Sequence, residues 1–305
     1  MSIFPRWLVN WVKRSPRLLA RYRAVQWQWH LLQDWWGTKI WKRTREVTTP
    51  LGFKLTAGIH PAYAQMRSGQ FEPAETALLS RLLPQADVFI DVGANLGFYT
   101  CLALKAGKPV VAFEPQPQNL HCLFRNLEAN GWAEGAEVFP LALSDRPGLL
   151  RLYGASGPSA SLIQGWAGYS TRFSQTVPVS TLDRLLGGRF SAQRLLIKMD
   201  VEGAEYQVLE GALDTLERVP QPVWLIEICL QEFHPGGSNP DFQQIFELFF
   251  SRGYVGYAVA QRLQAVTPDE VKRWVAQGHS AAGSFNYLFL AVEQAAALLG
   301  ETGPG

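Results

Sequence analysis

Two groups of acidic residues stand where apolar strands should give way to loops, and both are placed to bind or activate a ligand. The first lies in "VFIDVGANLGFYT" (88–100), where Asp91 is followed by two glycines, and the second lies in "KMDVEGAE" (198–205). A strand that only fills a core does not need to end in this way. A strand whose end helps to bind a ligand at the start of the next helix does need such an ending, because the free backbone N–H groups there attract carboxylates and phosphates.

The first group predicts a binding site for S-adenosylmethionine. Gly93 and Gly97 allow a tight turn, but Asn95 occupies the middle glycine position of a GxGxxG fingerprint, which argues against a nicotinamide-dependent dehydrogenase. Asp91 suits a ligand with an ammonium group, and Glu114 closes the next strand, where an acid can accept hydrogen bonds from ribose hydroxyls. Ammonium, carboxylate and ribose together describe S-adenosylmethionine. The alternative is that the glycines only turn the chain and Glu114 caps the next helix.

The second group is placed to take a proton from an acceptor. Lys198, Asp200 and Glu202 point to one side if the strand persists that far. A carboxylate there can accept a hydroxyl proton as a methyl group arrives, and Lys198 can keep the carboxylates ionised. Asp200 and Glu202 are therefore candidate catalytic residues together with Lys198, whereas Glu205 more simply caps the following helix.

Two further side chains are expected at the same edge of the sheet. Glu227 closes the strand "PVWLIEI" (222–228), and His234 follows seven residues later. Both are candidate bases, although a lone histidine in a loop is more often solvated than catalytic. With Asp200 and Glu202 they would also suit Mg²⁺. Close positioning can supply most of a methyl-transfer rate without one, and we predict no metal.

The first 50 residues differ from the rest of the chain. They hold ten Lys and Arg against two acidic residues, and seven of the eleven tryptophans, although the whole chain has a net charge of only +2. They contain neither the apolar core of a signal peptide nor a run of about 18 apolar residues that could span a membrane. Trp and basic residues favour an anionic membrane surface, so the composition of residues 1–45 predicts that this segment makes peripheral membrane contact. The same residues could instead pack on the rest of the protein or on a second subunit.

Downstream of Asp87, short apolar strands alternate with amphipathic helices, which predicts a parallel sheet with helices on both faces. A hairpin is expected at 47–58. The small, polar segment 154–170 is a candidate lid or acceptor wall, although Trp166 and Tyr169 could equally anchor it to the core. Three cysteines without CxxC spacing indicate a reducing, cytoplasmic setting.

Four motifs, "FIDVGANLGFYT", "AFEPQPQNLHCLFRNLEANG", "VSTLDRLL" and "LLIKMDVEGAEYQVLEGA", follow one another in the order and spacing of the FkbM family of S-adenosylmethionine-dependent methyltransferases. The chain resembles this family over about residues 65–235. The resemblance implies an α/β class I methyltransferase (Rossmann-like) fold, with a seven-stranded sheet whose last strand, "SFNYLFLAV" (284–292), is antiparallel. It also implies S-adenosyl-L-methionine as cofactor and O-methylation of a glycan, glycolipid or secondary metabolite. The alternatives are N-methylation and a non-catalytic, membrane-associated subunit that binds the cofactor.

These expectations divide the chain into a basic, Trp-rich helical segment (1–46), a methyltransferase domain (47–295) and a flexible tail (296–305). The acceptor is expected to be a small molecule, a glycan or a lipid-linked group, with no nucleic acid involved. The expected cofactor contacts are Asp91, Gly93, Asn95, Gly97, Tyr99, Glu114, Pro115 and Ser144.

Overall fold

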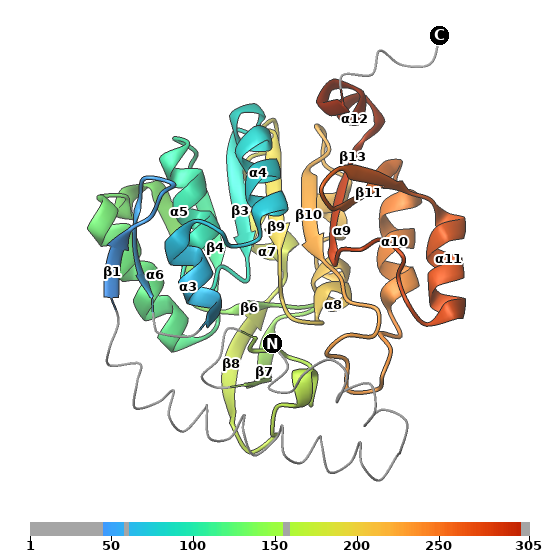
Figure 1. Cartoon of the computed structure of the whole chain (residues 1–305), viewed down its shortest axis with the longest axis horizontal. Helices are drawn as coiled ribbons and strands as arrows, with labels where there is room; N and C mark the ends of the chain where they lie inside the picture. Colours follow the sequence, from blue (N-terminus) through green and yellow to red (C-terminus); the bar gives the residue numbers. More distant parts are fainter. Residues whose placement is uncertain (1–44, 58–60, 155–158, 300–305) are drawn as a thin grey trace.

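The computed structural model describes residues 45–57, 61–154 and 159–299. All but Arg45 of the segment predicted to contact a membrane, residues 1–45, therefore lies outside the described residues. The last helix, α12, spans Val292–Leu299 (Figure 1). The predicted boundary between domain and tail at residue 295 thus falls inside a helix.

The central sheet consists of eight strands, one more than predicted. They are β3 (Val88–Val92), β4 (Val110–Phe113), β5 (Ala136–Phe139), β9 (Leu195–Met199), β10 (Val223–Glu227), β11 (Tyr254–Val259), β12 (Leu263–Val266) and β13 (Asn286–Ala291). Their order is β12-β11-β13-β10-β9-β3-β4-β5 (Figure 1). The last strand, β13, is antiparallel to both of its neighbours, as expected. The additional strand is β12, which turns back on β11 and pairs with it at the edge of the sheet.

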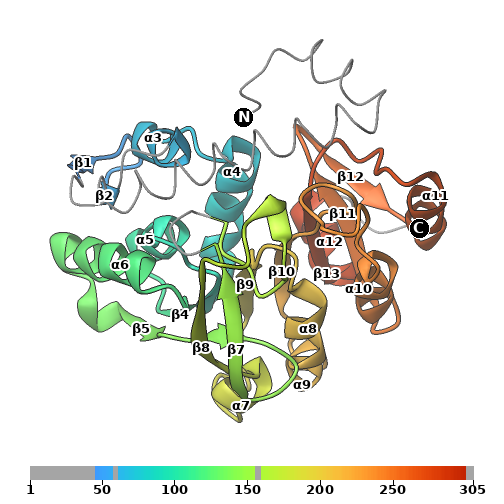
Figure 2. The same ribbon diagram turned by 90° about the horizontal axis from the view of Figure 1, so that it is seen from below.

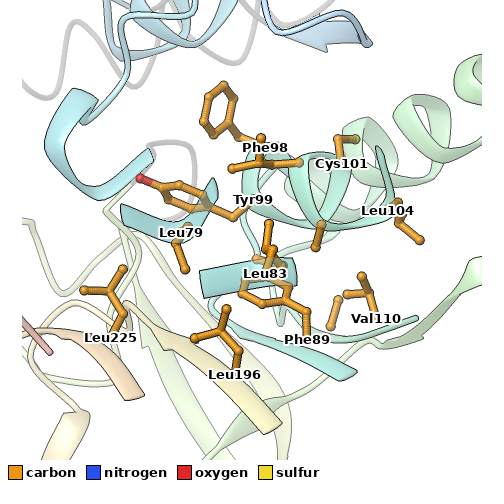
Figure 3. Packing of buried hydrophobic residues seen from close by; sticks show 14 of the residues in the cluster. Leu79, Leu83, Phe89, Phe98, Tyr99, Cys101, Leu104, Val110, Leu196 and Leu225 are labelled. Carbon is orange, nitrogen blue, oxygen red and sulfur yellow. The ribbon is translucent and has the colours of Figure 1, made fainter. Parts of the chain in front are cut away.

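Helices cover both faces of this sheet, because the strands place apolar side chains alternately on each face. One face packs against α4 (Pro73–Leu82), α5 (Phe98–Lys105), α6 (Pro117–Asn130) and α12, and the other against α7 (Leu182–Leu186), α8 (Glu205–Glu210), α9 (Leu213–Leu216), α10 (Phe242–Phe250) and α11 (Pro268–Gln277). Figure 3 shows Phe89, Leu196 and Leu225 of three adjacent strands packed beneath Leu79 of α4. The face that α4 covers also carries the charged residues described next.

The strand register brings charged residues together on that face. Asp91 of β3 lies opposite Lys198 of β9, and Lys198 lies opposite Leu225 of β10. Since side chains alternate along a strand, Asp91 shares the face of Phe89, and Lys198 shares the face of Leu196. The residues that follow on β9 and β10 then emerge at the carboxyl edge of the sheet.

Smaller elements border this edge. The predicted hairpin is present as β1 (Arg45–Thr48) and β2 (Lys54–Ala57), followed by α3 (Pro61–Ser68). A second sheet, in the order β6-β8-β7, is formed by Ala142–Leu143, Ser174–Ser180 and Gly148–Tyr153 respectively. It lies beside the ends of β4 and β9 (Figures 1 and 2). In the part of the chain that the structure describes, no helix combines the length and apolar character needed to cross a bilayer.

Candidate active site

The loop after β3 turns through three residues in the left-handed backbone region. Gly93, Asn95 and Gly97 have φ angles of 84°, 53° and 87°. The N–H groups of Gly93 and Ala94 both donate to the carbonyl of Phe113 at 3.0 Å, which fixes the loop to β4. A Cβ atom on Gly93 would also collide with the backbone oxygen of Asp200. The glycine is therefore required by the crossing of two protein loops, whatever ligand lies nearby.

A cleft open to solvent lies at the carboxyl edge of the sheet. Four of the expected cofactor residues line it, namely Gly93, Asn95, Glu114 and Pro115. The other lining residues come from the ends of β3, β4 and β9, from α6, and from the small sheet and its loop: Val92, Phe113, Asn119, Leu141, Ala142, Leu143, Leu152, Ala160, Leu162, Asp200, Val201 and Glu202.

Glu114 is the anionic group at the β4 end of the cleft. Its two carboxylate oxygens accept the backbone N–H groups of Asn95 at 2.8 Å and Gln116 at 2.7 Å. Burial raises the pKa of Glu114 to about 7, although these hydrogen bonds oppose the shift. Each carboxylate oxygen can accept more than one hydrogen bond, so Glu114 keeps acceptor capacity for hydroxyl groups.

Buried polar atoms near Glu114 support a ligand here. Asn119 donates to Gln116 at 3.1 Å, but the Oδ1 of Asn119 and the Nε2 of Gln116 find no hydrogen-bond partner among the described residues. Buried polar groups normally have a partner. A ribose and a base offer such partners, so the residues present fit the S-adenosylmethionine that the sequence predicts.

The other four expected cofactor residues are not among the described residues that line the cleft. Asp91 is buried and accepts a hydrogen bond from the Thr100 hydroxyl at 2.5 Å. Gly97 is the N-cap of α5, Tyr99 points away toward Glu72, and the Ser144 hydroxyl donates to Asp145 at 3.1 Å. These positions shape the fold around the cleft, and their direct contacts with the cofactor stay a prediction.

Beside the cleft, three carboxylates converge from distant parts of the sequence. One oxygen atom each from Glu72, Asp200 and Glu227 lies within 4.8 Å of the others. Asp200 follows β9, Glu227 is the last residue of the adjacent strand β10, and Glu72 is the N-cap of α4. Asp200 also lines the cleft, so it connects the two parts of the site.

Lys198 lies beneath these carboxylates. Its side chain is 1% exposed, and its Nζ is 3.7 Å from Asp200 Oδ2 and 5.6 Å from the centre of the Tyr99 ring. No described residue accepts a hydrogen bond from it. Burial opposes the charge of Lys198, but the neighbouring carboxylates, Asp200 first, hold its pKa above the ordinary value. The site therefore contains a buried ammonium group whose N–H donors lack acceptors.

The pKa values of the surrounding acids are raised as well, which favours their neutral forms. Burial raises the pKa of Glu227 well above its ordinary value, and the charge of Asp200 adds to the shift. Burial also raises the pKa of Glu72, although the positive charge of Lys198 partly opposes this shift. Oxygen atoms in this arrangement are the ligands that Mg²⁺ prefers, but the Lys198 ammonium already supplies the positive charge at this place.

Glu202 is separate from this cluster. Its carboxylate accepts the indole N–H of Trp166 at 2.7 Å, and Trp166 is 2% exposed. Trp166 belongs to the segment predicted as a lid, in a short helix spanning Trp166–Gly168. Ala160 and Leu162 of the same segment line the cleft. The segment is therefore a wall of the cleft, and Trp166 anchors it to the core.

His234 lies on the far side of this anchor. Its ring is edge-on to Trp166, with 6.1 Å between ring centres, and its Nδ1 accepts the N–H of Gly236 at 3.4 Å. Burial lowers its pKa. The convergent carboxylates do not include His234 or Glu202. Glu205 lies in the first turn of α8, but its carboxylate accepts the N–H of Gly203, in the turn before the helix, at 2.9 Å, and no side chain caps this helix.

Sequence reasoning missed Glu72. Pro73 at the first helical position marks Glu72 as the residue before a helix, but nothing in the sequence indicates which way its side chain points. In the structure Glu72 has φ 41° and ψ 67°, a left-handed conformation that costs a residue with a side chain roughly 1–3 kcal/mol. Strain of this kind is common at functional sites.

Comparison with known proteins agrees with this geometry. Residues 91–255, more than half of the chain, match the sequence profile described as "Methyltransferase FkbM domain". The chain belongs to the FkbM methyltransferase family. It is therefore a methyltransferase of the class I, Rossmann-like type, as the resemblance predicts.

Relatives of this FkbM methyltransferase are known from archaea and fungi. "Hexuronic acid methyltransferase AglP" from Haloferax volcanii is 32% identical over 176 residues, covering 56% of this chain and 67% of that protein. "Methyltransferase sdnD" from Sordaria araneosa is 27% identical over 198 residues, covering 54% and 73%. A crystal structure of methyltransferase FkbM from Methylobacillus flagellatus is 18% identical, with a TM-score of 0.41, and covers 67% of this chain and 43% of that one.

Proposed function

We propose that this methyltransferase uses S-adenosylmethionine to methylate a hydroxyl group of a glycan, a lipid-linked glycan or a secondary metabolite. The relative from Haloferax volcanii is named for a hexuronic acid, which supports a sugar-like acceptor. Glu114 and the unpaired Asn119 and Gln116 atoms would hold the cofactor's nucleoside. When bound, S-adenosylmethionine supplies an electrophilic methyl group and leaves as the neutral thioether S-adenosylhomocysteine.

The observation that carries the proposal is the unsatisfied ammonium group of Lys198 beside Asp200, Glu227 and Glu72. Lys198 needs a hydrogen-bond acceptor, and the carboxylates need donors. A hydroxyl group is both at once. A hydroxyl acceptor could therefore pair with Lys198 and with a carboxylate, which supports O-methylation.

Asp200 is the carboxylate best placed to take the hydroxyl proton. It lies 3.7 Å from Lys198 and borders both the cleft and the carboxylate cluster, and its side chain is 29% exposed. A positioned base contributes roughly 10²–10⁴ in rate. Lys198 would donate to the same hydroxyl oxygen and orient it. Glu227 is the second candidate base, whereas Glu202 and His234 are occupied with the Trp166 anchor.

Residues 1–45 would bring the enzyme to its acceptor at a membrane surface. Their clustered Lys, Arg and Trp residues support peripheral contact with anionic lipid. An active site held at that surface would suit a lipid-linked acceptor.

The proposal is tested by methyl transfer from isotope-labelled S-adenosylmethionine. Purified protein is incubated with a glycan and lipid extract of cells that lack it, and the products are analysed by mass spectrometry. We expect a methylated hydroxyl, and a rate reduced roughly 10²-fold or more in Asp200→Asn, which cannot accept the proton. Label found on nitrogen would contradict O-methylation. Absence of transfer, with S-adenosylhomocysteine still bound, would instead indicate a non-catalytic subunit.

A further inference from the structure

Lys198 makes no hydrogen bond to any described residue, although the carboxyl groups of Asp200, Glu72 and Glu227 all act on its charge. Its side chain is 1% exposed, which leaves it little contact with solvent. Asp200 Oδ2 lies 3.7 Å from Nζ, close enough for an ion pair but beyond the length of a hydrogen bond. Buried polar groups normally have a partner, so the arrangement around Lys198 keeps its N–H donors away from the nearby oxygen atoms.

The hydroxyl group of Tyr99 holds the carboxyl group of Glu72. It donates to Glu72 Oε2 at 2.6 Å. Without this bond Glu72 would be free to turn toward Lys198, whose positive charge already acts on the pKa of Glu72. A carboxyl group accepts hydrogen bonds whether it is ionised or protonated. A released Glu72 would therefore occupy an N–H donor of Lys198 in either state.

The ring of Tyr99 stabilises the ammonium group without using its donors. Lys198 Nζ lies 5.6 Å from the ring centre, within the range of a cation–π interaction. This attraction acts between the charge and the face of the ring, so it requires no N–H group pointed at an acceptor atom. The ring is itself fixed, because it is buried and its centre lies 6.0 Å from that of Phe71 and 5.3 Å from that of Phe98 (Figure 3).

We propose that Tyr99 is a positioning residue of methyl transfer, which holds Glu72 and thereby keeps the N–H donors of Lys198 free for the hydroxyl group of the acceptor. This inference rests on the proposed O-methylation. The acceptor hydroxyl then accepts from Lys198 and donates to Asp200 without having to displace Glu72 from the ammonium group. Tyr99 is not among the described residues that line the cleft, so this role differs from the cofactor contact that the sequence predicts for it.

The test measures labelled methyl transfer at increasing amounts of the cell extract, which gives a maximal rate and the amount of extract that supports half of it. In Tyr99→Phe, which keeps the ring and removes the hydroxyl group, we expect this half-saturating amount to rise about tenfold, because a hydrogen bond to a charged group is lost to a competitor. The affinity for S-adenosylhomocysteine, measured by isothermal titration, should equal that of the wild type.

The matched control is Tyr254→Phe. Tyr254 is also buried, and its hydroxyl group donates to the carbonyl of Leu216 at 2.8 Å on the opposite face of the sheet. This variant loses one buried hydrogen bond as Tyr99→Phe does, but it should leave the half-saturating amount unchanged.

A double variant separates competition by Glu72 from a general loss of structure. Glu72→Ala removes the competitor, so adding Tyr99→Phe to it should change the half-saturating amount less than about twofold. The same rise with and without Glu72, or no rise in Tyr99→Phe, would overturn the inference. So would a loss of S-adenosylhomocysteine affinity in Tyr99→Phe, because Tyr99 would then serve the cofactor. Absence of transfer by the wild-type protein would contradict the proposed function itself, and with it the inference.

Discussion

Replacement of Glu202 by glutamine should change how the stability of this methyltransferase depends on pH. Glu202 accepts the indole N–H of Trp166 at 2.7 Å, and the carboxamide oxygen of Glu202→Gln can accept the same hydrogen bond. The substitution therefore removes one ionisable group while leaving the anchor of the 159–168 segment in place.

The direction of the pH dependence follows from the pKa of Glu202. Burial raises this pKa from 4.5 to about 8, and the charge of Asp200 adds to the shift. Between these two values the folded protein keeps the proton and the unfolded chain has lost it. Unfolding then releases a proton, so the contribution of Glu202 to stability is fully present below pH 4.5 and is lost as the pH rises through 8. The upper limit is about 1.4 kcal/mol for each pH unit. Because Glu202 is partly exposed, we expect its contribution to the free energy of unfolding to fall by a total of roughly 1–3 kcal/mol between pH 5 and pH 8.

The assay is urea unfolding of the wild type and Glu202→Gln at several pH values from 5 to 8. The difference in free energy of unfolding between the two proteins cancels the titrating groups that do not interact with Glu202. We expect this difference to shift in favour of the variant as the pH rises. Glu128→Gln, which changes an exposed carboxylate on α6, should run parallel to the wild type. Parallel curves for Glu202→Gln as well would refute the reasoning, because Glu202 would then bind equal numbers of protons in both states.

Three other predictions address the cofactor site, the loop crossing and the N-terminal segment. Glu114→Ala should weaken S-adenosylhomocysteine binding, measured by isothermal titration, by roughly 1.5–3 kcal/mol; equal affinity would mean that Glu114 does not hold the ribose. Gly93→Ala should lower the free energy of unfolding by more than Gly107→Ala does. Both glycines have a positive φ angle, but only at Gly93 would the new Cβ collide with backbone atoms, those of Asp200. Similar losses of stability in the two variants would mean that the loops of Gly93 and Asp200 move apart easily. Full-length protein should sediment with anionic vesicles at low salt and release at high salt, whereas a chain beginning at Thr48 should stay in solution; full-length protein that ignores the vesicles would end the membrane proposal.

The sheet and the cofactor loop were predictable because their signals are local. Short apolar runs such as "VFIDV" and "RLLIKM" predict buried parallel strands, and the carboxyl ends of parallel strands share one edge. That rule alone brings Glu114, Asp200 and Glu227 to the same side of the molecule. The register between β3 and β9, which sets Asp91 opposite Lys198, depends on the whole sheet and could not be read from either strand.

The contacts that the sequence did not reveal involve residues far apart along the chain. Glu72 reaches the site only because α4 packs over the strands that carry Lys198 and Leu225. Asp91 was expected to face a ligand, and the sequence did not show that Thr100, nine residues later on α5, donates to its Oδ2. A helix that packs directly on the strand before it can cover such a residue, and no local pattern shows whether it does.

The different surroundings of Asp200 and Glu202 show where the alternation rule stops. Two residues apart on a strand, they would face the same way, and the sequence suggested a shared role on that condition. The strand β9 ends at Met199, however, and Glu202 and Gly203 take φ angles of 55° and 97°. A side chain on Gly203 would collide with the Trp166 ring, so the indole packs against this turn and bonds to the carboxylate beside it. The left-handed turn thus gives the two acids separate surroundings: Asp200 stays with Lys198 in the carboxylate cluster, where we propose that the acceptor binds, and Glu202 holds the wall of the cleft through Trp166.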